Sequence, residues 1–110
     1  MGELKKIRPR HLQVYVQCFP RRDFAYVNQL RSASVSVMSN IAEGYGRSTD
    51  RDFARFLDIA RGSALEAQSL ICVGLDVEYM DEGTFDELME AADHIVAQIT
   101  SLSRYLRTKG

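Results

Sequence analysis

The sequence is poor in glycine and proline, with seven and two among 110 residues, and it has no tryptophan. Turn-rich β folds, collagen-like chains and low-complexity segments use far more glycine and proline, so this scarcity excludes them and favours helices. The 45 % hydrophobic and 26 % charged residues are typical of a globular protein rather than a disordered one. At this length we expect a single domain over residues 1–110.

Cysteine is also scarce, because the sequence contains only Cys18 and Cys72. A secreted disulfide scaffold uses more cysteine pairs and follows an apolar leader, so we expect a reduced, cytoplasmic protein. Both cysteines lie in apolar runs without a neighbouring histidine and acid, which predicts buried, inert thiols. No apolar run approaches the roughly 18 residues of a membrane span, and we expect no membrane partner.

A large excess of one charge is absent as well, since 14 basic residues face 15 acidic ones. This balance argues against a protein that coats nucleic acid through bulk charge. The charges are nevertheless polarised: residues 76–110 hold eight acids and three bases, whereas residues 1–31 hold seven bases and two acids. We expect the basic part to begin with a loose arm over about residues 1–8. Its candidates for contact with nucleic acid are Lys5, Lys6, Arg8, Arg10, Arg21 and Arg22.

Apolar residues recur at helical spacing in four segments, which predicts helices over about residues 9–19, 24–45, 50–75 and 81–109. Thr49 and Asp52 resemble a capping box at the start of the third helix. The last helix begins with acids and ends with bases, a polarity that suits the helix dipole. Because the connections are short, consecutive helices should be antiparallel. The fold class is therefore all-α, an up-down-up-down antiparallel four-helix bundle.

The helix expected over residues 24–45 carries two apolar stripes, and a helix with two apolar sides needs two partners. One stripe fills the core of the bundle and contains Val27, Leu30, Ser34, Val37 and Ile41. The second stripe contains Val35, Met38, Ala42 and Tyr45. Either another element of the chain or another copy of it must cover these four residues, which makes them the candidates for an oligomer interface.

Small residues occupy the middle of the helix expected over residues 50–75, including Ala60, Gly62 and Ala64. They let a neighbouring backbone approach, so we expect the tightest contacts of the domain there, with Gly62 as a packing glycine. Gly44 and Gly46 are expected to end the preceding helix in the left-handed conformation.

One segment is specific enough to suggest a family: Ser39-Asn40-Ile41-Ala42-Glu43-Gly44-Tyr45-Gly46-Arg47, followed by Phe53, Phe56, Leu57, Ile59, Ala60, Gly62, Ser63 and Glu66. It resembles the central motif of the four-helix-bundle proteins encoded in intervening sequences of bacterial 23S ribosomal RNA genes. The resemblance covers about a third of the chain, and Met38 stands where that family usually has a proline.

The resemblance implies a closed ring of four-helix bundles, typically a pentamer, without established enzymatic activity or cofactors. A related accessory protein of diversity-generating retroelements works with a reverse transcriptase and RNA, which makes nucleic-acid association the family-level expectation. We therefore expect a non-enzymatic homo-oligomer that serves as a nucleic-acid-associated accessory or scaffold protein. The alternatives are RNA or single-stranded DNA binding through the basic residues as the primary activity and, with less support, an enzyme with a site between subunits.

The polar residues of the motif allow two interpretations. Asn40, Glu43 and Arg47 lie on one helical face, and Glu66 follows in the next helix. They form either a structural network between the two helices, with Ser39 or Ser63 as a further partner, or a charged groove for a ligand. In the structural interpretation, Glu43→Ala and Asn40→Ala should each destabilise the fold by about 1–3 kcal/mol.

A metal site is not expected. His11 and His94 have no cysteine or carboxylate at ligand spacing, and Ala91 occupies the position where a Glu-x-x-His signature places its glutamate. We expect His11 on the surface and His94 at the boundary of the apolar side of the last helix. Gly44-Tyr45-Gly46 follows a helix rather than a strand, so nucleotide binding is not indicated either.

Overall fold

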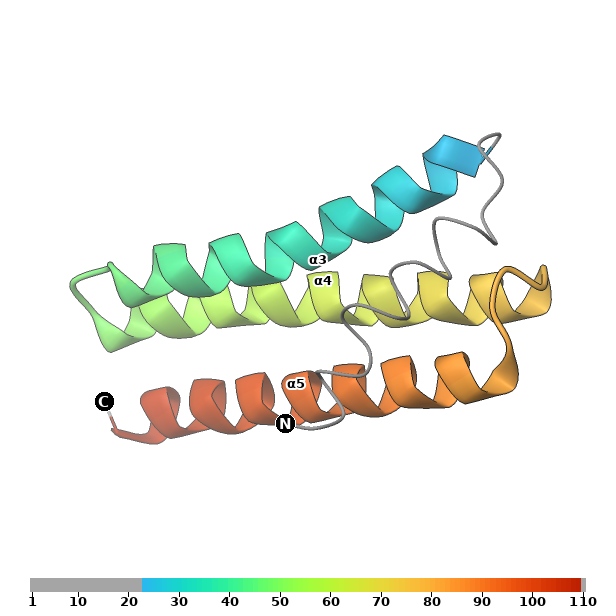
Figure 1. Ribbon diagram of the computed structural model, residues 1–110. Helices are drawn as coiled ribbons and strands as arrows, with labels where there is room; N and C mark the ends of the chain where they lie inside the picture. The colour runs from blue at the N-terminus through green and yellow to red at the C-terminus, as the bar shows by residue number, and fades with distance from the viewer. Residues whose placement is uncertain (1–22, 110) are drawn as a thin grey trace.

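The computed structural model describes residues 23–109. In this range the chain forms α3 (Phe24–Tyr45), α4 (Asp50–Asp76) and α5 (Glu82–Lys109), and each helix runs antiparallel to the one before it (Figure 1). The all-α class and three of the predicted helices are confirmed. The helix expected over residues 9–19 lies outside the described residues, so the four-helix bundle stays a prediction.

The middle helix organises the fold. α4 packs against α3 on one side and against α5 on the other, and it lies between them in Figure 1. The main cluster of the buried core consists of Val37 from α3, Ala54, Leu57, Ala60 and Ala64 from α4, and Ile99 and Leu106 from α5. None of the three helices combines the length and apolarity that a bilayer-spanning helix needs.

Side-chain caps set where the helices begin. The Asp23 carboxylate accepts from the Tyr26 amide at 3.1 Å, and the Thr49 hydroxyl accepts from the Asp52 amide at 3.1 Å. The Asp81 carboxylate accepts from the Thr84 amide at 2.8 Å just before α5. These bonds satisfy amides that have no partner within the helix. The predicted Thr49 cap is confirmed.

The two glycines at the end of α3 do not act as predicted. Gly44 lies inside the helix, and Gly46 caps it with φ −81° and ψ −1°, which is right-handed backbone. Within residues 23–109, Glu78 is the residue with a positive φ, at 65°. The expectation of a left-handed stop at Gly44 or Gly46 is therefore wrong.

The small residues of α4 divide between two sides of the helix. Ala60 and Ala64 are 0 % and 4 % exposed and bring the helix backbones together, as predicted. Gly62 is exposed, and a Cβ added to it would meet no atom within 4 Å. The expectation that Gly62 packs inside the domain is wrong, because it lies on the outward side of α4.

Candidate functional site

One side of α3 exposes large apolar side chains. Tyr26 and Gly44 are buried against α4, whereas Val35, Met38 and Tyr45 are 59 %, 71 % and 79 % exposed. The exposed set, here called the α3 outer stripe, consists of Phe24, Arg31, Val35, Met38, Ala42 and Tyr45. All four residues predicted for an oligomer interface lie in it. A row of exposed apolar side chains on one helix is typical of a surface that binds another protein.

A hydroxyl contact joins α3 to α4 next to this stripe. The Ser36 and Ser63 hydroxyls lie 2.7 Å apart, and the Asn40 amide nitrogen donates to the Ser36 carbonyl at 2.8 Å and to its hydroxyl at 3.1 Å. Ser39 is exposed and donates to the same carbonyl at 3.4 Å. Ser36 is thus the centre of the contact, although the sequence analysis did not single it out.

The charged motif residues lie apart from this contact. Arg47 donates to the Glu43 carboxylate at 2.9 Å, and both side chains are exposed. The Arg47 and Arg55 guanidinium groups stack over the Phe56 ring at 4.8 and 4.7 Å. Glu66 is exposed and has no hydrogen bond or ion pair with any residue in the described range. The structure therefore connects Asn40 and Ser63 through Ser36, and it pairs Glu43 with Arg47 separately. It does not join the six polar motif residues into one network.

These positions predict unequal mutational effects. Ser36→Ala should lower the free energy of unfolding by about 1–2 kcal/mol, because Ser63 and Asn40 both lose a partly buried partner. Glu43→Ala should cost less than about 0.5 kcal/mol, because its ion pair lies on the surface within one helix. Thermal melts of the two variants test this difference. Equal losses would show that Glu43 belongs to the helix contact after all.

The motif glycine Gly44 has a steric role. A Cβ at this position would lie 2.7 Å from the Phe56 Cβ and 2.9 Å from Phe53 Cδ1. The Phe53 ring also meets the Tyr45 ring edge-to-face, with centroids 6.1 Å apart. Glycine therefore lets α4 cross the end of α3 closely, which fixes the tight turn between the two helices and places Tyr45 at the end of the outer stripe.

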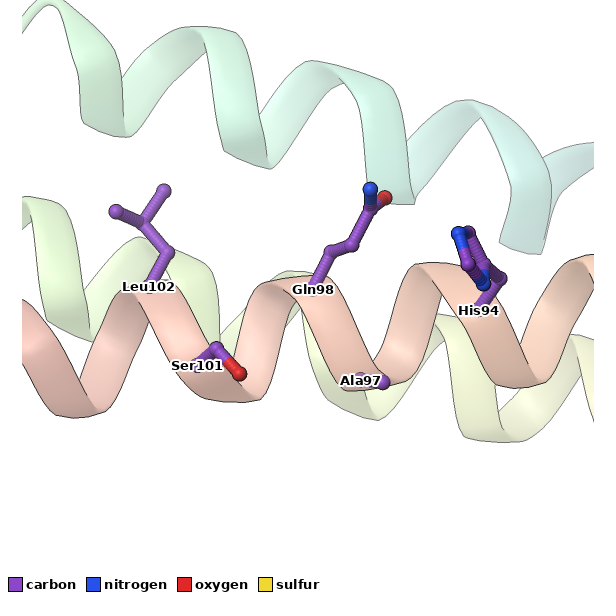
Figure 2. Close-up of a pocket in the computed structure, with 5 residues that line it drawn as sticks. All are labelled: His94, Ala97, Gln98, Ser101 and Leu102. Carbon is purple, nitrogen blue, oxygen red and sulfur yellow. The ribbon is translucent and has the colours of Figure 1, made fainter.

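A surface depression lies on α5. It is lined by His94, Ala97, Gln98, Ser101 and Leu102, and Figure 2 shows His94, Gln98 and Leu102 projecting to one side of that helix. All five residues come from one helix, so the depression is a shallow shelf rather than an enclosed pocket. Nothing in the described part of the chain pairs His94 with a nucleophile, which leaves this shelf without recognisable catalytic chemistry.

The remaining sequence-based expectations have mixed outcomes. Cys72 is exposed, so the prediction that it is buried is wrong. It follows Ile71, which is buried, and an apolar run cannot show which of its members faces outward. No group of three histidine, cysteine or carboxylate side chains within residues 23–109 could hold a metal ion. His11, Cys18 and the nucleic-acid candidates Lys5, Lys6, Arg8, Arg10, Arg21 and Arg22 lie outside the described residues.

With this geometry established, the comparison with known families is decisive. A family model described as 23S rRNA-intervening sequence protein matches residues 5–101. The chain belongs to this family. No curated protein matches the chain significantly. The match includes α3, α4 and most of α5, so the Ser36 contact, the Gly44 crossing and the α3 outer stripe all lie in the part of the chain that matches the family.

An ionic cluster between α4 and α5 could not be recognised in the sequence. Arg107 donates to both Asp58 oxygens, at 2.6 and 3.2 Å, and the buried Ser103 hydroxyl donates to the same carboxylate at 3.0 Å. The bonds from Arg107 lower the pKa of Asp58 below its ordinary value. Asp58 and Arg107 are 49 residues apart, so no local spacing reveals the pair. This cluster joins the first half of α4 to the end of α5.

Tyr26 was missed as well. Its hydroxyl donates to the Leu70 carbonyl at 2.5 Å, and a Cβ at Gly74 would collide with that hydroxyl. The hydroxyl of a buried tyrosine usually has a hydrogen-bond partner, and this rule was the one available indication of the contact. Burial, together with the negative charge of Asp23, raises the pKa of Tyr26 from 10.0 to about 12. The contact anchors the start of α3 to α4.

The raised pKa predicts a specific alkaline effect. Because the folded protein holds this proton more tightly than the unfolded chain, the stability from Tyr26 is complete below pH 10 and is lost as the pH rises to about 12. Tyr26→Phe should cost about 1 kcal/mol at neutral pH. The difference in unfolding free energy between parent and variant should shrink across that range, as measured by urea melts. A constant difference would contradict the raised pKa.

Proposed function

We propose that this chain is a cytoplasmic, non-enzymatic protein that assembles with copies of itself and serves as a nucleic-acid-associated accessory or scaffold protein. The observation that carries the self-assembly is the α3 outer stripe, in which Phe24, Met38 and Tyr45 are 66 %, 71 % and 79 % exposed. Leaving such side chains in water is unfavourable, at about 25 cal/mol per Å² of apolar surface, and packing against another copy removes that surface from water.

A ring is the form of assembly that the resemblance suggests, with five copies as its typical number. The depression on α5 is lined by one helix and pairs His94 with no nucleophile in residues 23–109, which supports a role in binding rather than catalysis. The mass of the protein in solution tests the assembly. A chain that stays at 12.5 kDa at micromolar concentration would remove this proposal, whereas a dimer would keep the interface and discard the ring.

The second part of the proposal is association with RNA or single-stranded DNA. Residues 1–22 hold six basic side chains and one acid, and an oligomer repeats this segment several times. Several weak phosphate contacts can then add up to stable binding. The resemblance to the family also implies a relation to the accessory protein of diversity-generating retroelements, which works with RNA, and this relation would favour the same function. The acidic residues of 76–90, by contrast, repel a phosphate backbone.

Gel retardation of structured RNA at about 50 mM salt, where phosphate contacts are strongest, tests this second part. We expect retardation by the parent and its loss when Lys5, Lys6, Arg8 and Arg10 are replaced by glutamine. Replacing Arg104, an exposed base of α5, provides the control for an unspecific change of charge. An RNA that migrates unchanged with the parent would end this part of the proposal and leave the self-assembly intact.

A further inference from the structure

The outward side of α4 carries a second stripe, which the sequence analysis did not anticipate. The α4 outer stripe consists of Asp52, Arg55, Ile59, Gly62, Glu66 and Val73. Ile59 and Val73 are 43 % and 45 % exposed. Gly62 lies in the middle of the stripe and faces open space. A glycine inside a helix costs about 1 kcal/mol relative to alanine, and no contact in residues 23–109 explains this one.

The two outer stripes repeat at the same interval. Positions 24, 31, 38 and 45 of α3 are separated by seven residues, and so are positions 52, 59, 66 and 73 of α4. A seven-residue repeat keeps the same side of a helix facing a partner helix along its length, in the packing of coiled coils. Two such stripes can therefore pack along their full length at a crossing angle of about 20°.

One antiparallel alignment makes the two stripes complementary. When Arg31 lies opposite Glu66, the same spacing places Met38 opposite Ile59 and Phe24 opposite Val73. In the same alignment Val35 lies opposite Gly62, so that the branched side chain of valine faces a residue that has no side chain. At one end, the Tyr45 hydroxyl comes opposite the Asp52 carboxylate. Apolar residues thus meet apolar residues, Arg31 meets Glu66, and Asp52 meets a hydroxyl group. The charge of Arg55, which falls opposite Ala42, is paired with Asp52 of its own helix at 3.6 Å.

The charges decide which surfaces pair. Arg31 and Glu66 are exposed, and neither has an ion pair or hydrogen bond within residues 23–109. If two α3 stripes paired with each other over the same residues, Arg31 would lie opposite Met38. If two α4 stripes paired, Glu66 would lie opposite Ile59. Either arrangement buries a charge against an apolar side chain, which is unfavourable, whereas the mixed pairing neutralises both charges.

We propose that the α3 outer stripe of one copy packs antiparallel on the α4 outer stripe of the next copy, with Arg31 paired to Glu66 and Val35 seated at Gly62. This inference rests on the self-assembly proposed above and assigns its two surfaces. Each copy binds one neighbour through its α3 outer stripe and the other neighbour through its α4 outer stripe. The contact is therefore heterologous and repeats from copy to copy. Contacts of this kind generate closed rings when the rotation between copies closes.

Charge reversal tests the pairing. Arg31→Glu and Glu66→Arg should each weaken assembly, raising the dissociation constant at least tenfold, because like charges then meet in the contact. The double variant carrying both changes should restore the mass of the parent in light scattering. Arg104→Glu and Glu90→Arg make the same charge changes at exposed positions of α5 and should leave the mass unchanged.

Gly62 provides an independent test by size. Gly62→Leu should dissociate the assembly, because its side chain occupies the place of Val35 from the next copy. The folded monomer has room for this side chain, so the helical circular dichroism should be retained. Ser101→Leu adds a comparable side chain on exposed α5 and serves as the control.

The outcomes separate this inference from the proposal on which it rests. A parent that is monomeric overturns both. A parent that assembles, combined with a double charge variant that does not recover or with a Gly62→Leu variant that keeps its mass, overturns only the pairing of the two stripes. In that case, variants of Arg31 that act without any dependence on Glu66 would indicate pairing between two α3 stripes.

Discussion

Replacing Gly44 with alanine should lower the free energy of unfolding by about 2–3 kcal/mol, although alanine is the better helix former. The added Cβ would lie 2.7 Å from the Phe56 Cβ, 2.9 Å from Phe53 Cδ1 and 3.3 Å from the Phe53 carbonyl oxygen. The Phe53 carbonyl oxygen belongs to the backbone and the Phe56 Cβ is bonded directly to it, so neither atom can move without shifting α4. The overlap therefore outweighs the gain of about 1 kcal/mol in helix propensity.

Gly46 supplies the matched control for this prediction. It lies two residues away with an ordinary φ of −81°, and the nearest atoms to an added Cβ are at 3.7 and 3.8 Å. Gly46→Ala should therefore change stability by less than about 1 kcal/mol. Thermal and urea melts of both variants provide the comparison. If Gly44→Ala melts at or above the temperature of the parent, the close crossing of α3 and α4 is wrong.

Replacing Met38 with glutamate should dissociate the proposed assembly, raising its dissociation constant about 100-fold or more. Met38 is 71 % exposed in the single chain and lies at the centre of the α3 outer stripe. Burying a carboxylate in an apolar contact without a partner is costly, and residues at the centre of an interface carry most of its binding energy. The fold of the single chain should be unaffected, because position 38 faces water there.

Gln29→Glu controls for the introduced charge, because Gln29 is exposed on the same helix but outside the stripe. Sedimentation velocity should show a smaller particle for Met38→Glu and an unchanged particle for Gln29→Glu, with the same helical circular dichroism for both. An assembly that tolerates Met38→Glu would place the contact between copies somewhere other than on α3.

Local features of the fold could be predicted from the sequence. The apolar period located α3, α4 and α5, and the Thr49 cap followed from a spacing of three residues. The exposure of Met38 and Tyr45 also followed from the period, since one helix had more apolar residues than one partner could cover. In each case, the information lies within a few turns of one helix.

Contacts between helices could not be predicted in the same way. Ser36 and Ser63 are 27 residues apart, and Asp58 and Arg107 are 49 apart, so their contacts depend on how the helices pack. The same limit explains the error at Gly62 and explains why the close contact at Gly44 was not predicted. A small residue at helical spacing indicates a close approach, but the sequence does not say whether the neighbour belongs to the same chain. Gly44 meets Phe53 and Phe56 of its own chain, whereas Gly62 meets nothing in the described residues.

In the proposed assembly, the α3 outer stripe is buried between copies of the chain. The most direct test is the mass of the parent protein, measured by multi-angle light scattering over a dilution series in the micromolar range. We expect a mass several times the 12.5 kDa of one chain, and five times that mass for the ring suggested by the family. A constant mass of 12.5 kDa at every concentration would contradict the claim.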